Sequence, residues 1–252
     1  MTKKIDRTGE INTNTQGLIM KIIAYRKNND IDVQFEDGTI KTCEYGQFKK
    51  GKVKNPNHKR IWGVAYIGDG KYKSCDNYKF LKSYRCWESM LRRCYDKKLK
   101  ERQPTYKDVI CCEEWLNYQN FAKWYDENYY EIEGEQMALD KDILIKGNKV
   151  YSPKTCCFVP KRINILFVKN DAVRGSLPIG VRHSRTKKGY QTECNILNNP
   201  IYLGTFSTPE EAFKVYKEFK ENYIKQVADE YKDKIPKKLY EAMYRYEVEI
   251  TD

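Results

Sequence analysis

Two carboxylates separated by a single residue are the first side chains of this sequence that could do chemistry. Asp140 and Asp142 flank Lys141 in the segment LDKDIL. Oxygen ligands of this kind suit Mg²⁺. Lys141 itself is a poor base for activating water near pH 7, because two adjacent carboxylates raise the pKa of an ammonium group. An equally simple interpretation is a strand whose alternate acidic side chains face solvent or a neighbouring basic patch.

The charge of the chain lies in blocks. The 252 residues include 47 Lys and Arg against 35 Asp and Glu, which gives a net charge of +12. Residues 1–60 carry +6, residues 71–109 carry +7 and residues 143–190 carry +10, whereas residues 110–142 carry −7. A basic surface that neutralises phosphates releases counterions, so these blocks favour a nucleic-acid partner. A general bias of the composition toward Lys and Arg would explain the net charge but not its distribution in blocks.

The sequence also predicts where the protein resides. No segment approaches the roughly 18–20 apolar residues of a membrane span, and residues 1–8 lack the apolar core of a signal peptide. The nine cysteines are odd in number and have no CxxC spacing, which favours buried free thiols over a zinc ribbon or disulfides. We therefore expect a cytoplasmic protein without a membrane partner.

The elements that must position the candidate residues begin with short strands. Residues 18–25, 31–35 and 39–44 have strand composition and predict a small SH3-like barrel. The basic tail that follows it, up to residue 60, is either a linker or an arm that contacts phosphates. Apolar residues then recur at helical spacing from Leu81 to Cys94, and a second aromatic stripe predicts another helix over 113–129.

The C-terminal part has the clearest pattern. Residues 179–183, 190–196 and 201–206 predict three strands. Thr208, Pro209 and Glu211 form a capping box with proline in the first turn, and an apolar face follows it to about residue 228. Three strands and an amphipathic helix make a two-layer domain.

This C-terminal pattern, GVR…KGYQ…YLGTFSTPEEAFKVY, resembles the ethylene-response-factor (Apetala-two) DNA-binding domain and its relatives in phage endonucleases. In that family the sheet lies in the major groove and the helix braces it from behind. The resemblance implies DNA contacts on or beside the exposed sheet face from Arg182, Arg185, Lys187, Lys188, Tyr190 and Gln191. Arginine suits guanine edges, glutamine suits adenine and lysine suits phosphates. The alternative is a solvated hairpin on an interaction module.

The central segment, roughly residues 78–170, resembles phage HNH-type homing endonucleases in SYRCWESMLRRCYD, LDKDIL and GNKVYSPKTCCFVP. The resemblance implies a ββα-metal site in which Asp140, Asp142 and Asn164 act in catalysis and hold Mg²⁺ or Mn²⁺. The histidine of that family is absent, because Lys141 stands in its place and the chain contains only His58 and His183. Asn164 can equally be a helix cap.

Together these patterns predict a multidomain α+β fold. It would contain a small barrel-like β unit over residues 1–60, a central helical and ββα-metal-like domain over 61–175, and a three-stranded sheet with a helix over 176–252. The expected function is binding of double-stranded DNA by a phage or mobile-element protein, with metal-dependent nicking or cleavage. The alternative is a non-catalytic DNA-binding protein. Such a protein would act as a regulator, or as a phage counter-defence factor such as an anti-CRISPR that contacts a host nucleic-acid-processing complex.

Overall fold

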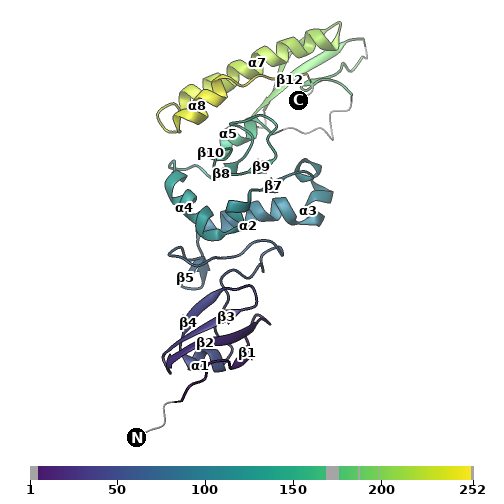
Figure 1. Ribbon diagram of the computed structural model, residues 1–252. Helices are drawn as coiled ribbons and strands as arrows, with labels where there is room; N and C mark the ends of the chain where they lie inside the picture. Colours follow the sequence, from purple (N-terminus) through teal and green to yellow (C-terminus); the bar gives the residue numbers. More distant parts are fainter. Residues whose placement is uncertain (1–4, 169–175, 187, 198, 251–252) are drawn as a thin grey trace. The chain divides into compact units, whose positions relative to one another are not determined.

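The computed structural model describes residues 5–168, 176–186, 188–197 and 199–250 (Figure 1). The chain is a mixed α+β protein, and it divides into two compact units, residues 1–107 with 111–125 and residues 108–110 with 126–252. The prediction of a multidomain α+β fold is therefore confirmed. The predicted boundaries near residues 60 and 175 lie inside these units, so the three-part division stays a prediction. Within the described ranges, no helix has the length and apolar character needed to cross a membrane.

The first unit begins with an antiparallel meander. Strands β1 (Ile11–Thr13), β2 (Ile19–Lys27), β3 (Asp30–Phe35) and β4 (Ile40–Cys43) pair in chain order. Apolar side chains alternate along β2 and β3, so Met20 and Val33 lie on one buried face, where Phe48 of α1 (Tyr45–Lys49) joins them. The described strands pair in the linear order β1-β2-β3-β4, and the predicted SH3-like barrel stays a prediction. The short β1 pairs only with β2, and the chain passes from β4 directly into α1.

The helical part of this unit packs aromatic side chains. Its elements are β5 (Cys75–Asp76), β6 (Lys79–Phe80), α2 (Lys82–Tyr95), α3 (Lys97–Arg102), η1 (Pro104–Tyr106), η2 (Glu113–Leu116) and α4 (Tyr118–Asn128). Trp87 of α2 is fully buried, and its Nε1 donates to the carbonyl oxygen of Trp115 at 2.6 Å. The single helix predicted over 113–129 is wrong, because Asn117 is extended and separates η2 from α4. Its side-chain oxygen accepts from the amide of Gln119 at 3.0 Å, a local bond that competes with helical pairing.

The second unit contains a strand–loop–strand–helix segment. Its elements are β7 (Ile110–Cys111, of which Ile110 belongs to this unit), β8 (Met137–Asp140), β9 (Val150–Tyr151), β10 (Cys157–Pro160) and α5 (Lys161–Leu166). Strands β8 and β10 are antiparallel, with Asp140 opposite Cys157. Helix α5 follows β10 at once and packs against both strands. Asp140 is therefore the last residue of its strand, at the entrance to the loop that joins β8 to β9.

The C-terminal elements follow the predicted order. Strands β11 (Val181–His183), β12 (Tyr190–Ile196) and β13 (Asn199–Phe206) form one antiparallel sheet, followed by α7 (Pro209–Glu230) and α8 (Lys237–Tyr244). The predicted capping box is confirmed. Thr208 Oγ1 accepts from the amide of Glu211 at 3.2 Å, and Glu211 Oε2 accepts from the amide of Thr208 at 3.3 Å.

Helix α7 serves two cores at once (Figure 1). Its first half packs Phe213 and Tyr216 against the β11–β13 sheet. Its second half places Ile224 and Val227 in a separate cluster with residues of β10, α5 and α8. A helix of 22 residues is about 33 Å long, enough to serve both cores. The sheet and the β8–β10–α5 segment are therefore braced by the same helix.

Candidate nucleic-acid interface

The β11–β13 sheet carries a row of polar side chains on the face that α7 leaves uncovered. Arg182 lies opposite Gln191 across β11 and β12, and Gln191 lies opposite Thr205 across β12 and β13. Because side chains alternate along a strand, these three share one face. Their inward-facing neighbours Val181 and Cys194 are buried against α7. Arg182 and Thr205 are exposed and Gln191 is half-buried, so the row is open to a large ligand.

An ion pair lies beside this row. Arg182 Nη2 is 2.8 Å from Glu193 Oε2, and their side chains are 54% and 37% exposed. An exposed pair of this kind contributes at most about 1 kcal/mol. Arg182 is therefore held by a bond weak enough to exchange for a base edge or a phosphate.

Sequence reasoning missed three residues of the open face, namely Glu193, Tyr202 and Thr205. Tyr202 is 59% exposed, and its hydroxyl shares a hydrogen bond of 2.7 Å with the Thr205 hydroxyl. The alternation of β13 carried a signal for them. However, the register shifts between Thr192 and Glu193, so counting by twos from one end of the strand assigns the wrong face at the other end.

The loop between β11 and β12 carries the other predicted contacts. Arg185 and Lys188 are exposed there, and the predicted contact Lys187 lies outside the described residues. Tyr190 lies opposite His183 and packs against the α7 cluster, beside the open face rather than on it, so its predicted DNA contact stays a prediction. The next residue, Gln191, lies on the open face, so Tyr190 packs on the side of the sheet that faces α7.

The start of the sheet is fixed on α7 at Gly180. The carbonyl oxygen of Gly180 accepts from Thr192 Oγ1 at 2.8 Å and from the amide of Glu193 at 3.1 Å. Gly180 has a φ of +75°, and a Cβ built there would lie 2.1 Å from Cδ2 of Tyr216. Only glycine fits this close approach. Arg182, two residues later, is thereby placed on a rigid support.

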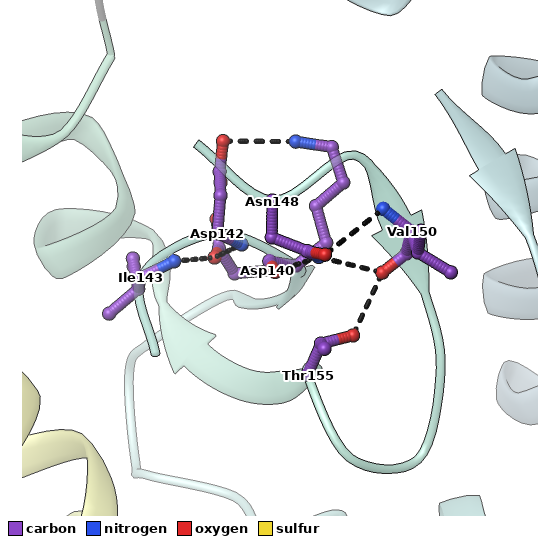
Figure 2. Close-up of polar contacts among 7 residues, drawn as sticks. Asp140, Asp142, Ile143, Asn148, Val150 and Thr155 are labelled. Carbon is purple, nitrogen blue, oxygen red and sulfur yellow. Dashed lines mark hydrogen bonds and ion pairs between the residues drawn. The ribbon is translucent and has the colours of Figure 1, made fainter. Parts of the chain in front are cut away.

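The second set of candidate residues lies in the loop after β8 (Figure 2). Asp140 Oδ1 accepts from the amide of Asp142 at 2.8 Å and from the amide of Ile143 at 2.7 Å. A carboxylate that binds two amides in succession closes a tight turn. The first role that the structure gives Asp140 is therefore to hold its own loop.

Amide and hydroxyl groups complete the same loop. Asn148 Nδ2 donates to the carbonyl oxygens of Lys141 and Val150, each at 2.7 Å. Thr155 Oγ1 donates to the carbonyl oxygen of Val150 at 2.8 Å, and its hydroxyl also shares a hydrogen bond of 2.8 Å with Ser152. Side chains thus satisfy backbone groups that the irregular loop leaves unpaired.

The charges of this loop are partly neutralised within it. Lys141 is buried, and its Nζ lies 2.9 Å from Asp142 Oδ2. Burial, helped by the neighbouring negative charge of Asp142, raises the pKa of Asp140 to about 6. The two backbone amides and Lys141 act in the opposite direction but do not cancel the effect of burial.

Asn164 is not brought to the two carboxylates by any contact of the described residues. It is the fourth residue of α5, it is half-buried, and its side chain has no hydrogen-bond partner there. The helix begins after Pro160, so Asn164 is not the N-cap that the alternative interpretation predicted. Its carbonyl oxygen accepts from the amide of Phe167 at 3.2 Å in the last turn.

The two carboxylates predicted as metal ligands already have other partners in this arrangement. Within the described part of the chain, no group of three or more His, Cys, Asp and Glu side chains is placed to hold a metal. One oxygen of Asp140 already accepts two amides, and Lys141 already neutralises Asp142. A protein site for Mg²⁺ needs carboxylate oxygens directed at one point. We therefore derive no reaction step through a metal.

Asp140→Asn should change the pH dependence of stability. A carboxyl group whose pKa is raised on folding, from 3.8 to about 6, stabilises the fold below its unfolded pKa and loses that contribution as the pH rises through 6. Asparagine keeps the oxygen acceptor without the charge. The variant should gain on the order of 1–3 kcal/mol relative to wild type between about pH 4 and pH 7. Urea unfolding at several pH values measures this, and a difference that does not vary with pH contradicts it.

Comparison with known proteins gives this arrangement no family. No protein-family model, curated protein or solved structure matched the chain. Evidence on function therefore comes from the open sheet face and the β8–β9 loop of the chain itself.

Proposed function

We propose that this protein binds double-stranded DNA through the open face of the β11–β13 sheet. The observation that carries the proposal is the row of Arg182, Gln191 and Thr205, one residue from each strand, on the face that α7 leaves uncovered. The major groove is wide enough to admit a β-ribbon, arginine pairs with guanine, and glutamine pairs with adenine. A braced sheet holds such groups in place for base contacts.

Charge around the row supports the same partner. Arg185 and Lys188 are exposed in the β11–β12 loop, next to the row. Residues 143–190 carry +10, the most basic block of the sequence. Phosphate contacts position a protein on the duplex while base contacts give preference. The loop and the row would divide these two tasks.

The salt dependence of binding tests the proposal. Fluorescence anisotropy with a labelled duplex should show binding at low ionic strength. The logarithm of the association constant should fall linearly with the logarithm of the salt concentration. Each lost phosphate contact reduces the slope by about 0.9, so Arg185→Ala with Lys188→Ala should flatten it by nearly 2. If the folded full-length protein does not bind duplexes at low salt, the proposal is ruled out.

Glu193→Gln should strengthen binding. The substitution removes a negative charge from the open face and releases Arg182 from its ion pair. Because an exposed pair contributes at most about 1 kcal/mol, we expect a gain of about 2- to 5-fold in duplex affinity. Glu218→Gln on the exposed side of α7 makes the same charge change away from the sheet and serves as the control. Equal gains in both variants would show a general charge effect instead.

Metal-dependent cleavage is the second candidate function. It is favoured by the order strand, loop, strand and helix over residues 137–166. Supercoiled plasmid incubated with Mg²⁺ or Mn²⁺ should then be nicked by wild type and left intact by Asp140→Asn with Asp142→Asn. Nicking that survives these substitutions would place the activity elsewhere or in a contaminant. An intact plasmid with both ions leaves the non-catalytic roles, regulation or counter-defence through a host complex.

A further inference from the structure

The hairpin formed by β5 and β6 has a backbone that does not suit its sequence. The amide of Leu81 donates to the carbonyl oxygen of Ser74 at 3.1 Å and closes a hairpin whose two turn residues are Asn77 and Tyr78. Both have positive φ, 45° and 62°. Two-residue turns of this kind strongly prefer glycine at the second position. A bulky side chain with positive φ is a true outlier.

Within the part of the chain that the structure describes, no packing contact compensates for tyrosine at this position. Tyr78 has a relative exposure of 105%, so the whole ring is in solvent. Phe80, on the next strand, is 54% exposed. Unfavourable backbone that persists without a packing gain points to a function for the side chain that occupies it. The structure therefore holds a tyrosine outward at a position where glycine would fold better.

The base of the hairpin, in contrast, is rigid. The rings of Phe80 and Tyr84 stack with centroids 4.7 Å apart, and Tyr84 meets Tyr118 edge to face at 5.6 Å. The Tyr118 hydroxyl donates to the carbonyl oxygen of Lys73 at 3.0 Å. Gln119 receives the amide of Tyr72 and donates to its carbonyl oxygen, each at 3.0 Å. The exposed ring therefore lies at the tip of a hairpin whose base is held by contacts with α2 and α4.

The charge around the tip identifies the class of partner. Residues 71–85 contain five basic side chains and a single acidic one. The basic residues are Lys71, Lys73, Lys79, Lys82 and Arg85. An outward aromatic ring among cations is the arrangement that binds unpaired nucleic acid, because bases stack on the ring while the cations meet the backbone.

We propose that the β5–β6 hairpin stacks Tyr78 on an unpaired base, of single-stranded nucleic acid or of a duplex at an opened position. This contact is additional to the sheet and does not depend on it, since the hairpin belongs to the first compact unit and the sheet to the second. Tyr78 is the binding residue, and Phe80 supports it from the base of the hairpin.

Substitution of Tyr78 in the full-length chain tests the proposal without damage to the fold. Tyr78→Gly suits the positive φ, so the variant should be at least as stable as wild type, while Tyr78→Phe keeps the ring. The probe is a single strand with one 2-aminopurine, whose fluorescence is quenched by stacking. Wild type and Tyr78→Phe should quench it, and Tyr78→Gly should lose the quenching together with about 5- to 150-fold in affinity.

Two outcomes overturn the inference. If Tyr78→Gly binds and quenches as wild type does, the ring takes no part in binding. If Tyr78→Phe loses as much as Tyr78→Gly, the hydroxyl rather than the ring makes the contact. Binding to a fully paired duplex, measured in parallel, should be unchanged in both variants. Failure of duplex binding through the sheet is thus distinguishable from failure of the hairpin contact.

Discussion

Arg182→Ala combined with Gln191→Ala is expected to weaken duplex binding by about 30-fold to 10⁴-fold. The two side chains lie opposite each other on the edge strand β11 and the central strand β12, on the open face. Each well-placed pairing of such a residue with a base contributes about 1–3 kcal/mol of discrimination, and both are lost together. Anisotropy titrations against duplexes of different sequence should also show a weaker preference among them.

The control for this variant removes the same positive charge at a position outside the sheet. Lys237 lies at the start of α8 with an 89% exposed side chain, in a long pair of 3.7 Å with Glu241. Lys237→Ala removes one positive charge, as Arg182→Ala does, and should change affinity by less than about 3-fold, since an exposed charge acts weakly at a distance. Equal losses in the two variants would mean that net charge, not the row on the sheet, governs binding.

Gly180→Ala is expected to destabilise the second unit by about 2–5 kcal/mol. The left-handed backbone contributes about 1–2 kcal/mol and overpacking against the Tyr216 ring a further 1–3 kcal/mol. The added Cβ would lie 2.1 Å from that ring, and the carbonyl of Gly180 is tied to β12, so neither side can yield easily. Urea unfolding followed by circular dichroism measures the change.

Gly134→Ala is the matched control for this substitution. Gly134 has nearly the same φ, +76° against +75°, but its added Cβ would meet nothing within 4 Å. Gly134→Ala should therefore lower the free energy of unfolding only by the cost of the left-handed backbone, about 1–2 kcal/mol. A similar loss at both positions would show that the contact of Gly180 with Tyr216 does not constrain the sheet.

The parts of the fold that local sequence dictates could be predicted. The capping box at Thr208 and the alternation of β12 depend on neighbouring residues, and both were found where expected. The helix break at Asn117 was missed because aromatic spacing continues across it, while one side-chain hydrogen bond ends the helical pairing. The sequence predicted helix α7 as the second layer of a domain with the sheet. Its second core, around Val227, depends on segments far away in the sequence.

The candidate sites were likewise predicted only where neighbouring residues determine the structure. Arg182 and Gln191, predicted on or beside the exposed face of the sheet, share its open face, whereas Tyr190, predicted with them, packs inward beside it. The role of Asp140 in closing its loop depends on the backbone conformation of Asp142 and Ile143, which residue types alone do not specify. The prediction that Asp140 and Asp142 bind a metal with Asn164 remains a prediction, and no contact in the described residues supports it.

Photo-crosslinking from the sheet tests the central claim most directly. Benzoylphenylalanine placed at Tyr202, which is 59% exposed on the open face, should crosslink to a bound DNA duplex. The same group at Glu218, on the exposed side of α7, should give little crosslinking at equal occupancy. Efficient crosslinking at 218 with none at 202 would contradict the account, because the DNA would then lie against the helix rather than the open sheet.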